Sequence, residues 1–130
     1  MIIDRIDHFV LTVRDVAATC DFYRQTLGMQ PEVFGDNRWA LTFGHQKINL
    51  HVAGKELEPK ARHPMPGGGD FCLITKTPMD DVVAHLERCG VAIELMPSPR
   101  TGADGPIVSV YFRDPDGNLV EVANYQNEVE

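Results

Sequence analysis

The sequence repeats itself at a fixed offset, and this repeat constrains the fold more than any other feature. The segment DHFVLTV, which begins at Asp7, aligns with GDFCLIT, which begins at Gly69. Gly28 and Gly90, which each follow an amphipathic segment, are related by the same offset. Because repetition at one offset is typical of a duplicated supersecondary unit, we expect two copies of one structural module.

Each copy begins with a short apolar strand and continues into a helix. In the first copy, Asp15 is placed to cap a helix that ends at Gly28. In the second copy, Thr77 precedes Pro78, which we predict to be the first helical residue, and the helix ends at Gly90. Both segments therefore predict a strand followed by a helix.

Three further apolar segments follow each helix, and turn signals such as GDN and DPDGN separate them. In the first copy these segments are 29–34, 38–43 and 47–52, and in the second copy they are 91–96, 107–112 and 119–124. The sequence thus predicts a single α+β domain over residues 1–130, made of two βαβββ modules at 1–52 and 70–130. A linker at 53–69, rich in glycine, proline and charge, joins them. We expect residues 97–106 to form a long loop, of a size that often has a function.

Composition excludes several classes of partner. The net charge of −7 argues against nucleic acid or an anionic membrane surface as a partner. No apolar run approaches the ~20 residues of a membrane span, and the N-terminal segment does not resemble a secretory signal, so we expect a cytoplasmic protein. Three widely spaced cysteines, Cys20, Cys72 and Cys89, predict reduced core thiols and no disulfide framework.

Alternation along the strands indicates which side chains face the helix of each module. In the first strand the apolar set faces the helix and leaves His8 on the opposite, concave face of the sheet. In the last strand Val120 and Val122 form the helix-facing pair, so Glu121 points to the concave face. The same argument directs His51 to that face, together with Asn49, and places Asp70 there in the second module.

These donors predict a metal site. Four strands would each direct an imidazole nitrogen or an oxygen to one cavity, where a carboxylate is costly to bury alone. A divalent cation removes that cost, and a mixed set of imidazole and carboxylate suits Mn, Fe, Ni, Co or Zn. The inward position of Glu121 is thereby explained if it is a metal ligand.

The whole pattern resembles a known family. Two βαβββ modules, His8 after the dipeptide ID, the segment FYRQTLGM and the terminal YFRDPDGNLVEVANY together resemble the vicinal oxygen chelate superfamily. That superfamily includes glyoxalase I, fosfomycin-modifying enzymes, extradiol dioxygenases and bleomycin-binding proteins. The stretch from INLHVAGKELEPK to GGGDFCLIT resembles more narrowly the branch called glyoxalase domain-containing protein 5. The resemblance implies a curved mixed sheet around a central cavity.

The resemblance also implies roles for individual residues. His8 and Glu121 match ligands on the first and last strands. His51 lies on the strand that supplies a second ligand, although in several relatives the acidic ligand aligns with Asn49. Asp70 stands where the family commonly has histidine. In such proteins the metal is chelated by two adjacent oxygens of a small substrate, and Glu121, or secondarily Asp70, is the candidate proton-shuttling base.

Three other residues are candidates for substrate binding. Arg100 could hold an anionic group, and Trp39 and Tyr111 could line a pocket; the alternatives are a solvated loop charge and ordinary core aromatic residues. Two functions stay open: a metal-dependent enzyme like lactoylglutathione lyase, of lyase, isomerase or transferase type, or a metal-free protein that sequesters a small molecule as bleomycin-binding relatives do. An extradiol dioxygenase is a weaker third choice. The resemblance also implies a homodimer.

Overall fold

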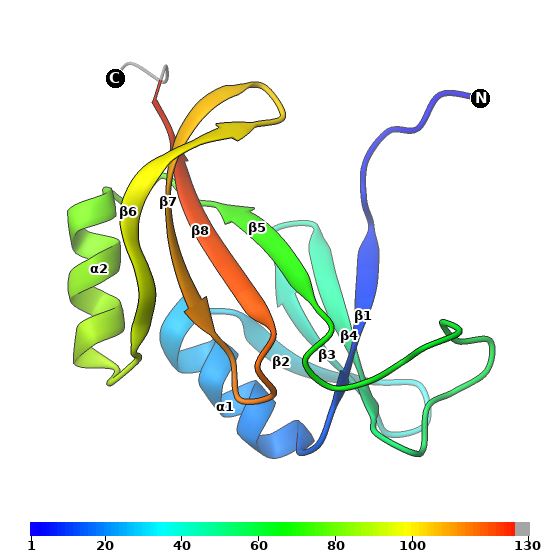
Figure 1. Cartoon of the computed structure of the whole chain (residues 1–130). Helices are drawn as coiled ribbons and strands as arrows, with labels where there is room; N and C mark the ends of the chain where they lie inside the picture. The colour runs from blue at the N-terminus through cyan, green and yellow to red at the C-terminus, as the bar shows by residue number, and fades with distance from the viewer. Residues whose placement is uncertain (127–130) are drawn as a thin grey trace. The chain divides into compact units, whose positions relative to one another are not determined.

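The computed structural model describes residues 1–126, and these form two four-stranded sheets and two helices (Figure 1). In chain order the elements are β1 (His8–Val13), α1 (Val16–Leu27), β2 (Gln30–Phe34), β3 (Arg38–Phe43), β4 (Gln46–Val52), β5 (Asp70–Ile74), α2 (Met79–Arg88), β6 (Ile93–Gly102), β7 (Gly105–Arg113) and β8 (Leu119–Tyr125). The order strand, helix, three strands occurs twice. The α+β class and the duplicated module are therefore confirmed.

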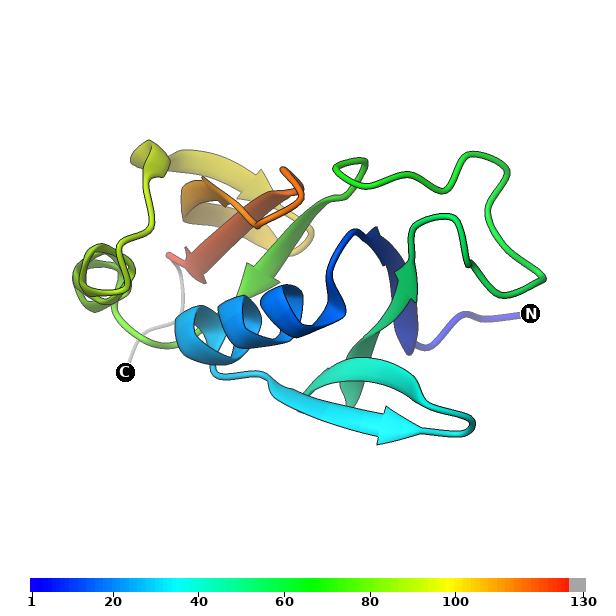
Figure 2. The ribbon, with the colours of Figure 1, turned by 90° about the horizontal axis from the view of Figure 1, so that it is seen from below.

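The chain divides into two compact units at Gly68 and Gly69. Each unit contains one sheet, with the strand order β1-β4-β3-β2 in the first and β5-β8-β7-β6 in the second. In both sheets the first strand of the module pairs in parallel with the last, and the other pairs are antiparallel. The repeat seen in the sequence is thus a repeat of topology. Residues 53–69 contain no helix or strand (Figure 2).

Helix α1 forms where the capping signals predict it. The Asp15 carboxylate accepts a hydrogen bond from the backbone N–H of Ala18 at 3.0 Å, which satisfies one free donor of the first turn. At the other end Gly28 adopts the left-handed conformation, with φ 67°, and donates its N–H to the carbonyl of Arg24. The helix packs on β2, β3 and β4 (Figure 2).

The core of the first unit follows the predicted alternation. Leu11 and Val13 of β1 are buried, whereas His8 and Val10, which alternate with them, are exposed. The buried apolar side chains of the other elements in this unit include Tyr23, Leu41, Ile48 and Leu50. Burying each large aliphatic side chain contributes about 1.5–3 kcal/mol, so this face fixes the register of the sheet.

Helix α2 begins one residue later than predicted. Pro78 is extended, with φ −54° and ψ 141°, and is the residue that precedes the helix, so Met79 and not Pro78 is the first helical residue. Thr77 consequently does not cap it. The helix buries Val82 and Leu86 and contacts β6. It ends at Arg88, and Gly90 follows with φ 75°.

The predicted long loop at 97–106 is wrong. Strand β6 continues to Gly102 and β7 starts at Gly105, so a tight hairpin replaces the loop and Arg100 lies in a strand. The prolines Pro97 and Pro99, which suggested a loop, are accommodated because β6 is an edge strand, where some N–H groups need no partner. Two register shifts before Ser98 mark the irregularity that they cause.

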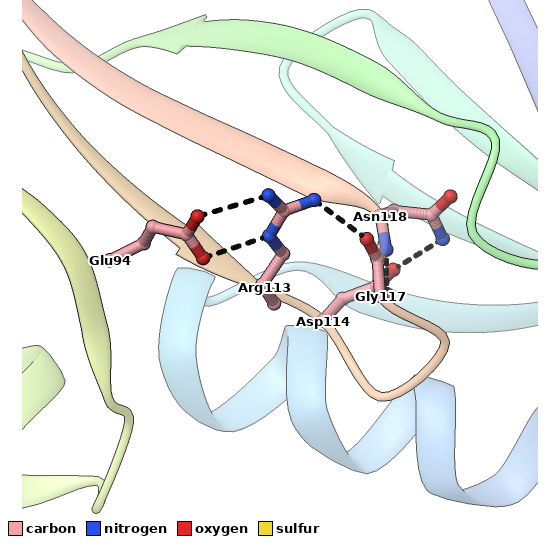
Figure 3. A network of polar contacts seen from close by, with 5 residues as sticks. All are labelled: Glu94, Arg113, Asp114, Gly117 and Asn118. Carbon is pink, nitrogen blue, oxygen red and sulfur yellow. Dashed lines mark hydrogen bonds and ion pairs between the residues drawn. The ribbon is translucent and has the colours of Figure 1, made fainter.

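The β7–β8 turn is the predicted hairpin at DPDGN, and Asp114 holds it together. One carboxylate oxygen of Asp114 accepts hydrogen bonds from the N–H groups of Asp116 and Asn118, both at 2.9 Å. The other carboxylate oxygen accepts a hydrogen bond from the side-chain amide of Asn118 at 2.8 Å (Figure 3). Gly117 supplies the positive φ, at 90°. The Asn118 side chain in turn accepts a hydrogen bond from the N–H of Gly69 at 2.7 Å, which ties the turn to the start of β5.

An ion pair flanks this turn on the surface. The guanidinium of Arg113 binds both carboxylate oxygens of Glu94 on β6, at 3.0 and 3.1 Å, and also donates to the carbonyl of Gly117 (Figure 3). This hydrogen bond is the main cause that lowers the pKa of Glu94 and raises the pKa of Arg113. The bidentate pair links β6 to β7 across a part of the sheet that the register shifts disturb.

The prediction of three core thiols is correct only for Cys20. Cys20 is buried against the first sheet, whereas Cys72 and Cys89 are exposed. Within residues 1–126 none of the three cysteines forms a disulfide. In the described part of the chain, no helix is long and apolar enough to cross a membrane.

We predict that replacing Asp114 destabilises the second unit. The change Asp114→Ala leaves two backbone N–H groups and the Asn118 amide without their acceptor at a buried position, which should cost about 2–4 kcal/mol of unfolding free energy. Urea denaturation followed by circular dichroism measures this. The matched variant Asp36→Ala, at an exposed turn, should change the free energy by less than about 0.5 kcal/mol. Equal stability of the two variants would contradict the role of Asp114.

Candidate functional site

Glu121 lies at the centre of one face of the second sheet. Its strand, β8, runs between β5 and β7, and Glu121 pairs with Cys72 on one side and with Tyr111 on the other. Because paired residues point to the same face, the three side chains are neighbours. The opposite face contains the buried Val120 and Val122. Glu121 is therefore a half-buried carboxylate on the face opposite to its two valine neighbours, and its predicted position in a central cavity stays a prediction.

The Glu121 carboxylate is surrounded by neutral hydrogen-bond donors. The hydroxyl of the buried Ser109 donates to Oε2 of Glu121 at 2.6 Å. A length this short is typical of a hydroxyl bound to an ionised carboxylate. The Tyr111 phenol and the Cys72 thiol lie on either side of Glu121, and the nearby carboxylate helps to raise the pKa of each group. Within residues 1–126, Glu121 forms no ion pair.

Arg100 and Tyr111 form a second layer beside this carboxylate. The Nε of Arg100 donates to the Tyr111 hydroxyl at 3.1 Å, and the guanidinium lies 5.4 Å from the centre of the tyrosine ring. Burial is the largest cause that raises the pKa of Tyr111, and Glu121 adds to it, whereas Arg100 opposes it. The phenol therefore stays protonated and can donate a proton toward Glu121 while it accepts a hydrogen bond from Arg100.

Cys72 is held as a neutral thiol. Although part of the residue is exposed, desolvation by its neighbours raises the pKa of the Cys72 thiol to about 11, and the negative charge of Glu121 and a hydrogen bond to it add to the effect. A thiol with this pKa is protonated at neutral pH and is a poor nucleophile.

Ser98 extends the polar face onto the edge strand. It pairs with Ser109, so its side chain points to the same side as Glu121. The Oγ of Ser98 is buried and has no hydrogen-bond partner within residues 1–126. An unpaired buried hydroxyl is costly, which makes this position suited to a polar group from outside the chain.

In the first unit, His8 lies on the exposed end of β1. Its Nδ1 is 2.8 Å from a carboxylate oxygen of Asp7, and this hydrogen bond is the main cause that lowers the pKa of Asp7. Histidine ligands of metals usually have such a partner on the second ring nitrogen, which fixes the ring and leaves Nε2 to the metal. The contact is compatible with the ligand role predicted for His8.

His51 and Asn49 lie on β4, on the same face as His8. Asn49 is 5 % exposed, and its Oδ1 has no hydrogen-bond partner among residues 1–126; His51 is 9 % exposed. His8 pairs with Lys47 on β4. Measured along β4 from Lys47, Asn49 is about 7 Å away and His51 about 13 Å away. Asn49 is thus the nearer neighbour of His8, and a shared role for His8 and His51 stays a prediction.

The other predicted residues have different surroundings. Trp39 pairs with Leu50 and faces the side of the first sheet opposite to Asn49, so the structure does not bring it together with the polar donors. Asp70 is exposed and lies on the same face of β5 as Cys72, two residues away. Across the described residues, no group of three or more His, Cys, Asp or Glu side chains lies close enough to hold a metal ion.

Sequence reasoning missed Ser109, Ser98 and the contact of Cys72 with Glu121. All three depend on which strands pair and in which register, and alternation along a single strand gives neither. One signal was available for Ser109. It stands two residues before Tyr111, so both side chains point to the same face of β7.

Comparison with known proteins gives consistent matches over nearly the whole chain. A family model described as Glyoxalase/Bleomycin resistance protein/Dioxygenase superfamily matches residues 5–122. The virulence protein STM3117 of Salmonella typhimurium is 54% identical over 96% of this chain and 87% of its own. Its crystal structure superposes with a TM-score of 0.95 and covers 96% of this chain and 99% of the solved one.

Two other relatives carry glyoxalase names. The glyoxalase domain-containing protein RDO1 of Mycosarcoma maydis is 49% identical, over 94% of this chain and 69% of its own. The crystal structure of a lactoylglutathione lyase from Agrobacterium tumefaciens is 26% identical, with a TM-score of 0.70 and 92% coverage of each chain. The narrower resemblance to glyoxalase domain-containing protein 5 stays a prediction.

We predict that the charge of Glu121 contributes to the low reactivity of Cys72. In metal-free protein, Glu121→Gln removes the negative charge, so the pKa of Cys72 should fall, while burial, the larger cause, keeps it raised. More thiolate is then present at a given pH, and iodoacetamide should alkylate Cys72 faster than in the parent between about pH 8 and pH 10. Peptide mass spectrometry measures the rate. The variant Glu87→Gln, on an exposed part of α2, is the control, and an unchanged rate in Glu121→Gln would contradict the contact.

Proposed function

The chain belongs to the glyoxalase/bleomycin resistance protein/dioxygenase superfamily, and we propose that it is a metal-dependent enzyme that acts on a small substrate with two adjacent oxygen atoms. The observation that carries the proposal is the environment of Glu121. A carboxylate half-buried in a sheet face, with hydroxyl and thiol donors around it and no cationic side chain paired with it, is suited to a cation from outside.

The donor types fit a divalent metal. We assign Glu121 and His8 as the main ligands, and Asp70 and His51 as further candidates, with Asn49 as the alternative on β4. Within residues 1–126 the Oδ1 of Asn49 has no hydrogen-bond partner, and Asn49 pairs with Val10, two residues from His8 on β1. This position supports Asn49 as the alternative ligand. A bound Mn, Ni, Fe, Co or Zn ion would polarise the substrate oxygens and stabilise the negative charge that develops on them.

The protein groups around Glu121 have defined tasks in this proposal. Glu121 accepts the substrate proton, and the Ser109 hydroxyl holds its carboxylate in one orientation. Tyr111 stays protonated beside it and can return a proton or stabilise the charged form of Glu121. Arg100, which lies beside the Tyr111 ring, contacts the part of the substrate next to Glu121. Of the predicted substrate residues, Arg100 and Tyr111 lie on the same face as Glu121, whereas Trp39 lies on the face of the first sheet opposite to Asn49, and its contact with a substrate stays a prediction.

The alternative is a metal-free protein that binds a small molecule. It is favoured by the absence, over residues 1–126, of three clustered His, Cys, Asp or Glu side chains. In that case Glu121, Tyr111 and Arg100 would contact the ligand directly. The two functions differ in whether binding requires a metal.

The relatives support the glyoxalase type of reaction without defining the substrate. The lactoylglutathione lyase is the only one of the three compared proteins whose name states a reaction, and it is 26% identical. We therefore propose a lyase, isomerase or transferase reaction. The cytoplasmic location of the protein stays a prediction.

We predict stoichiometric binding of a divalent metal to protein purified without chelator. Glu121→Gln should weaken Mn²⁺ binding about 100-fold or more, because it removes a charged ligand, a loss equivalent to ~3 kcal/mol. His8→Ala should weaken it as well. Isothermal titration of chelator-treated protein measures the affinity, with Glu87→Gln as the matched control. Failure of the parent to bind Mn²⁺, Ni²⁺ or Zn²⁺ would overturn the metal-dependent function and favour the alternative.

We also predict a homodimer, because family members of this size commonly pair. Analytical ultracentrifugation at micromolar concentration should give about twice the mass of 14.5 kDa. A monomer at this concentration would show the prediction to be wrong.

A further inference from the structure

Two cationic side chains in the first unit are held against one aromatic ring. Lys47 on β4 places its Nζ 3.8 Å from the centre of the Phe34 ring, and the guanidinium of Arg38 on β3 lies 4.6 Å from the same centre. A cation over an aromatic face is attracted to it, which restricts both long side chains. The ring thus fixes two positive charges in a small area.

Over residues 1–126, neither Arg38 nor Lys47 forms a hydrogen bond through its side chain or an ion pair with a carboxylate. Lys47 makes only a small electrostatic contribution to the lowered pKa of Asp7. Glu32, on β2, pairs with Ala40 and also forms no ion pair with them. In a chain with a net charge of −7, unpaired cations fixed side by side need an explanation.

The cations lie on the polar face of the first sheet, which is the face that carries His8 and Asn49. Lys47 pairs with His8 on β1 and with Thr42 on β3, and Asn49 pairs with Val10 and Ala40 in the next row. Residues at alternate positions of a strand share a face, so Lys47 and Asn49 point the same way. The face therefore combines two cations with the imidazole that we assign to the metal.

Asn49 supplies an independent observation. It is 5 % exposed, and its Oδ1 is buried without a hydrogen-bond partner in the part of the chain that the structure describes. An acceptor left unpaired at such a position is costly unless a ligand completes it. Lys47 and Asn49 are two residues apart, about 7 Å along the strand, which suits a molecule of three or four carbon atoms.

We propose that this face recognises a small organic anion that also carries a hydroxyl group. Arg38 and Lys47 bind the phosphate, phosphonate or carboxylate of the ligand, and Asn49 Oδ1 accepts a hydrogen bond from its hydroxyl. The inference rests on the proposed function in one respect, because it takes this ligand to be the substrate of the site to which His8 belongs. The inference specifies the class of substrate, which membership of the superfamily alone does not.

The experiment uses metal-free, chelator-treated protein and three probes: glycerol 3-phosphate, inorganic phosphate and glycerol. Isothermal titration should show saturable binding of glycerol 3-phosphate, weaker binding of phosphate and none of glycerol. Arg38→Met and Lys47→Met should each lower the affinity for glycerol 3-phosphate about tenfold, as expected for loss of one charge-assisted contact. Arg38→Lys and Lys47→Arg, which keep the charge, should retain most of the affinity and show that folding is not the cause.

Matched controls are Arg24→Met and Lys55→Met, which remove exposed cations elsewhere in the first unit and should leave binding unchanged. Asn49→Ala should remove the preference for glycerol 3-phosphate over phosphate and leave phosphate binding as it is. Equal affinity in the parent, Arg38→Met and Lys47→Met, or no binding by the parent, would overturn the inference. Glu121→Gln should lose Mn²⁺ but keep metal-free anion binding, so failure of the metal proposal and failure of this inference give different results.

Discussion

The structure depends on one constraint, the alternation of side chains across two sheets in which one face carries most of the large buried apolar side chains. In every strand of the duplicated module, the apolar set that fills the core determines where the remaining side chains point. Val120 and Val122 on β8 place Glu121 on the polar face, and Leu11 and Val13 on β1 do the same for His8. A shift of one residue would bury the donors and expose the core. The functional arrangement is thus maintained by the hydrophobic free energy of the other face.

The fold was predictable to the extent that its signals are local. Asp15 and Gly28 delimit α1, and the DPDGN turn joins β7 to β8, because capping and positive φ depend on residues close in sequence. The hairpin at β6 and β7 was not predictable in this way. Its prolines are typical of loops, and only the edge position of β6, which depends on strand order, makes them compatible with a strand.

The candidate site shows the same division. Alternation alone placed Glu121 on the polar face of the second sheet, and the structure agrees. Its neighbours Ser109 and Cys72, in contrast, follow from the register between strands that lie far apart in the sequence. The pairing of Arg38 and Lys47 with Phe34 has the same origin, since the three residues belong to three strands. Single-strand patterns therefore find individual donors, and pairing is needed to find the chemistry that they form together.

Each of the two units holds cationic side chains against an aromatic ring. An acidic chain should repel an anionic substrate at long range, but salt screens that repulsion beyond about 8–10 Å, so local charges decide binding. Arg100 lies on Tyr111 in the second unit, and Arg38 and Lys47 lie on Phe34 in the first; over residues 1–126 none of the three forms an ion pair with a carboxylate. The ring restricts each cation without neutralising its charge, although Arg100 also donates hydrogen bonds to the Tyr111 hydroxyl and the Pro99 carbonyl. Both units thus use the same solution, in which an aromatic ring replaces the carboxylate that would otherwise neutralise the cation, and the positive charge remains for a ligand.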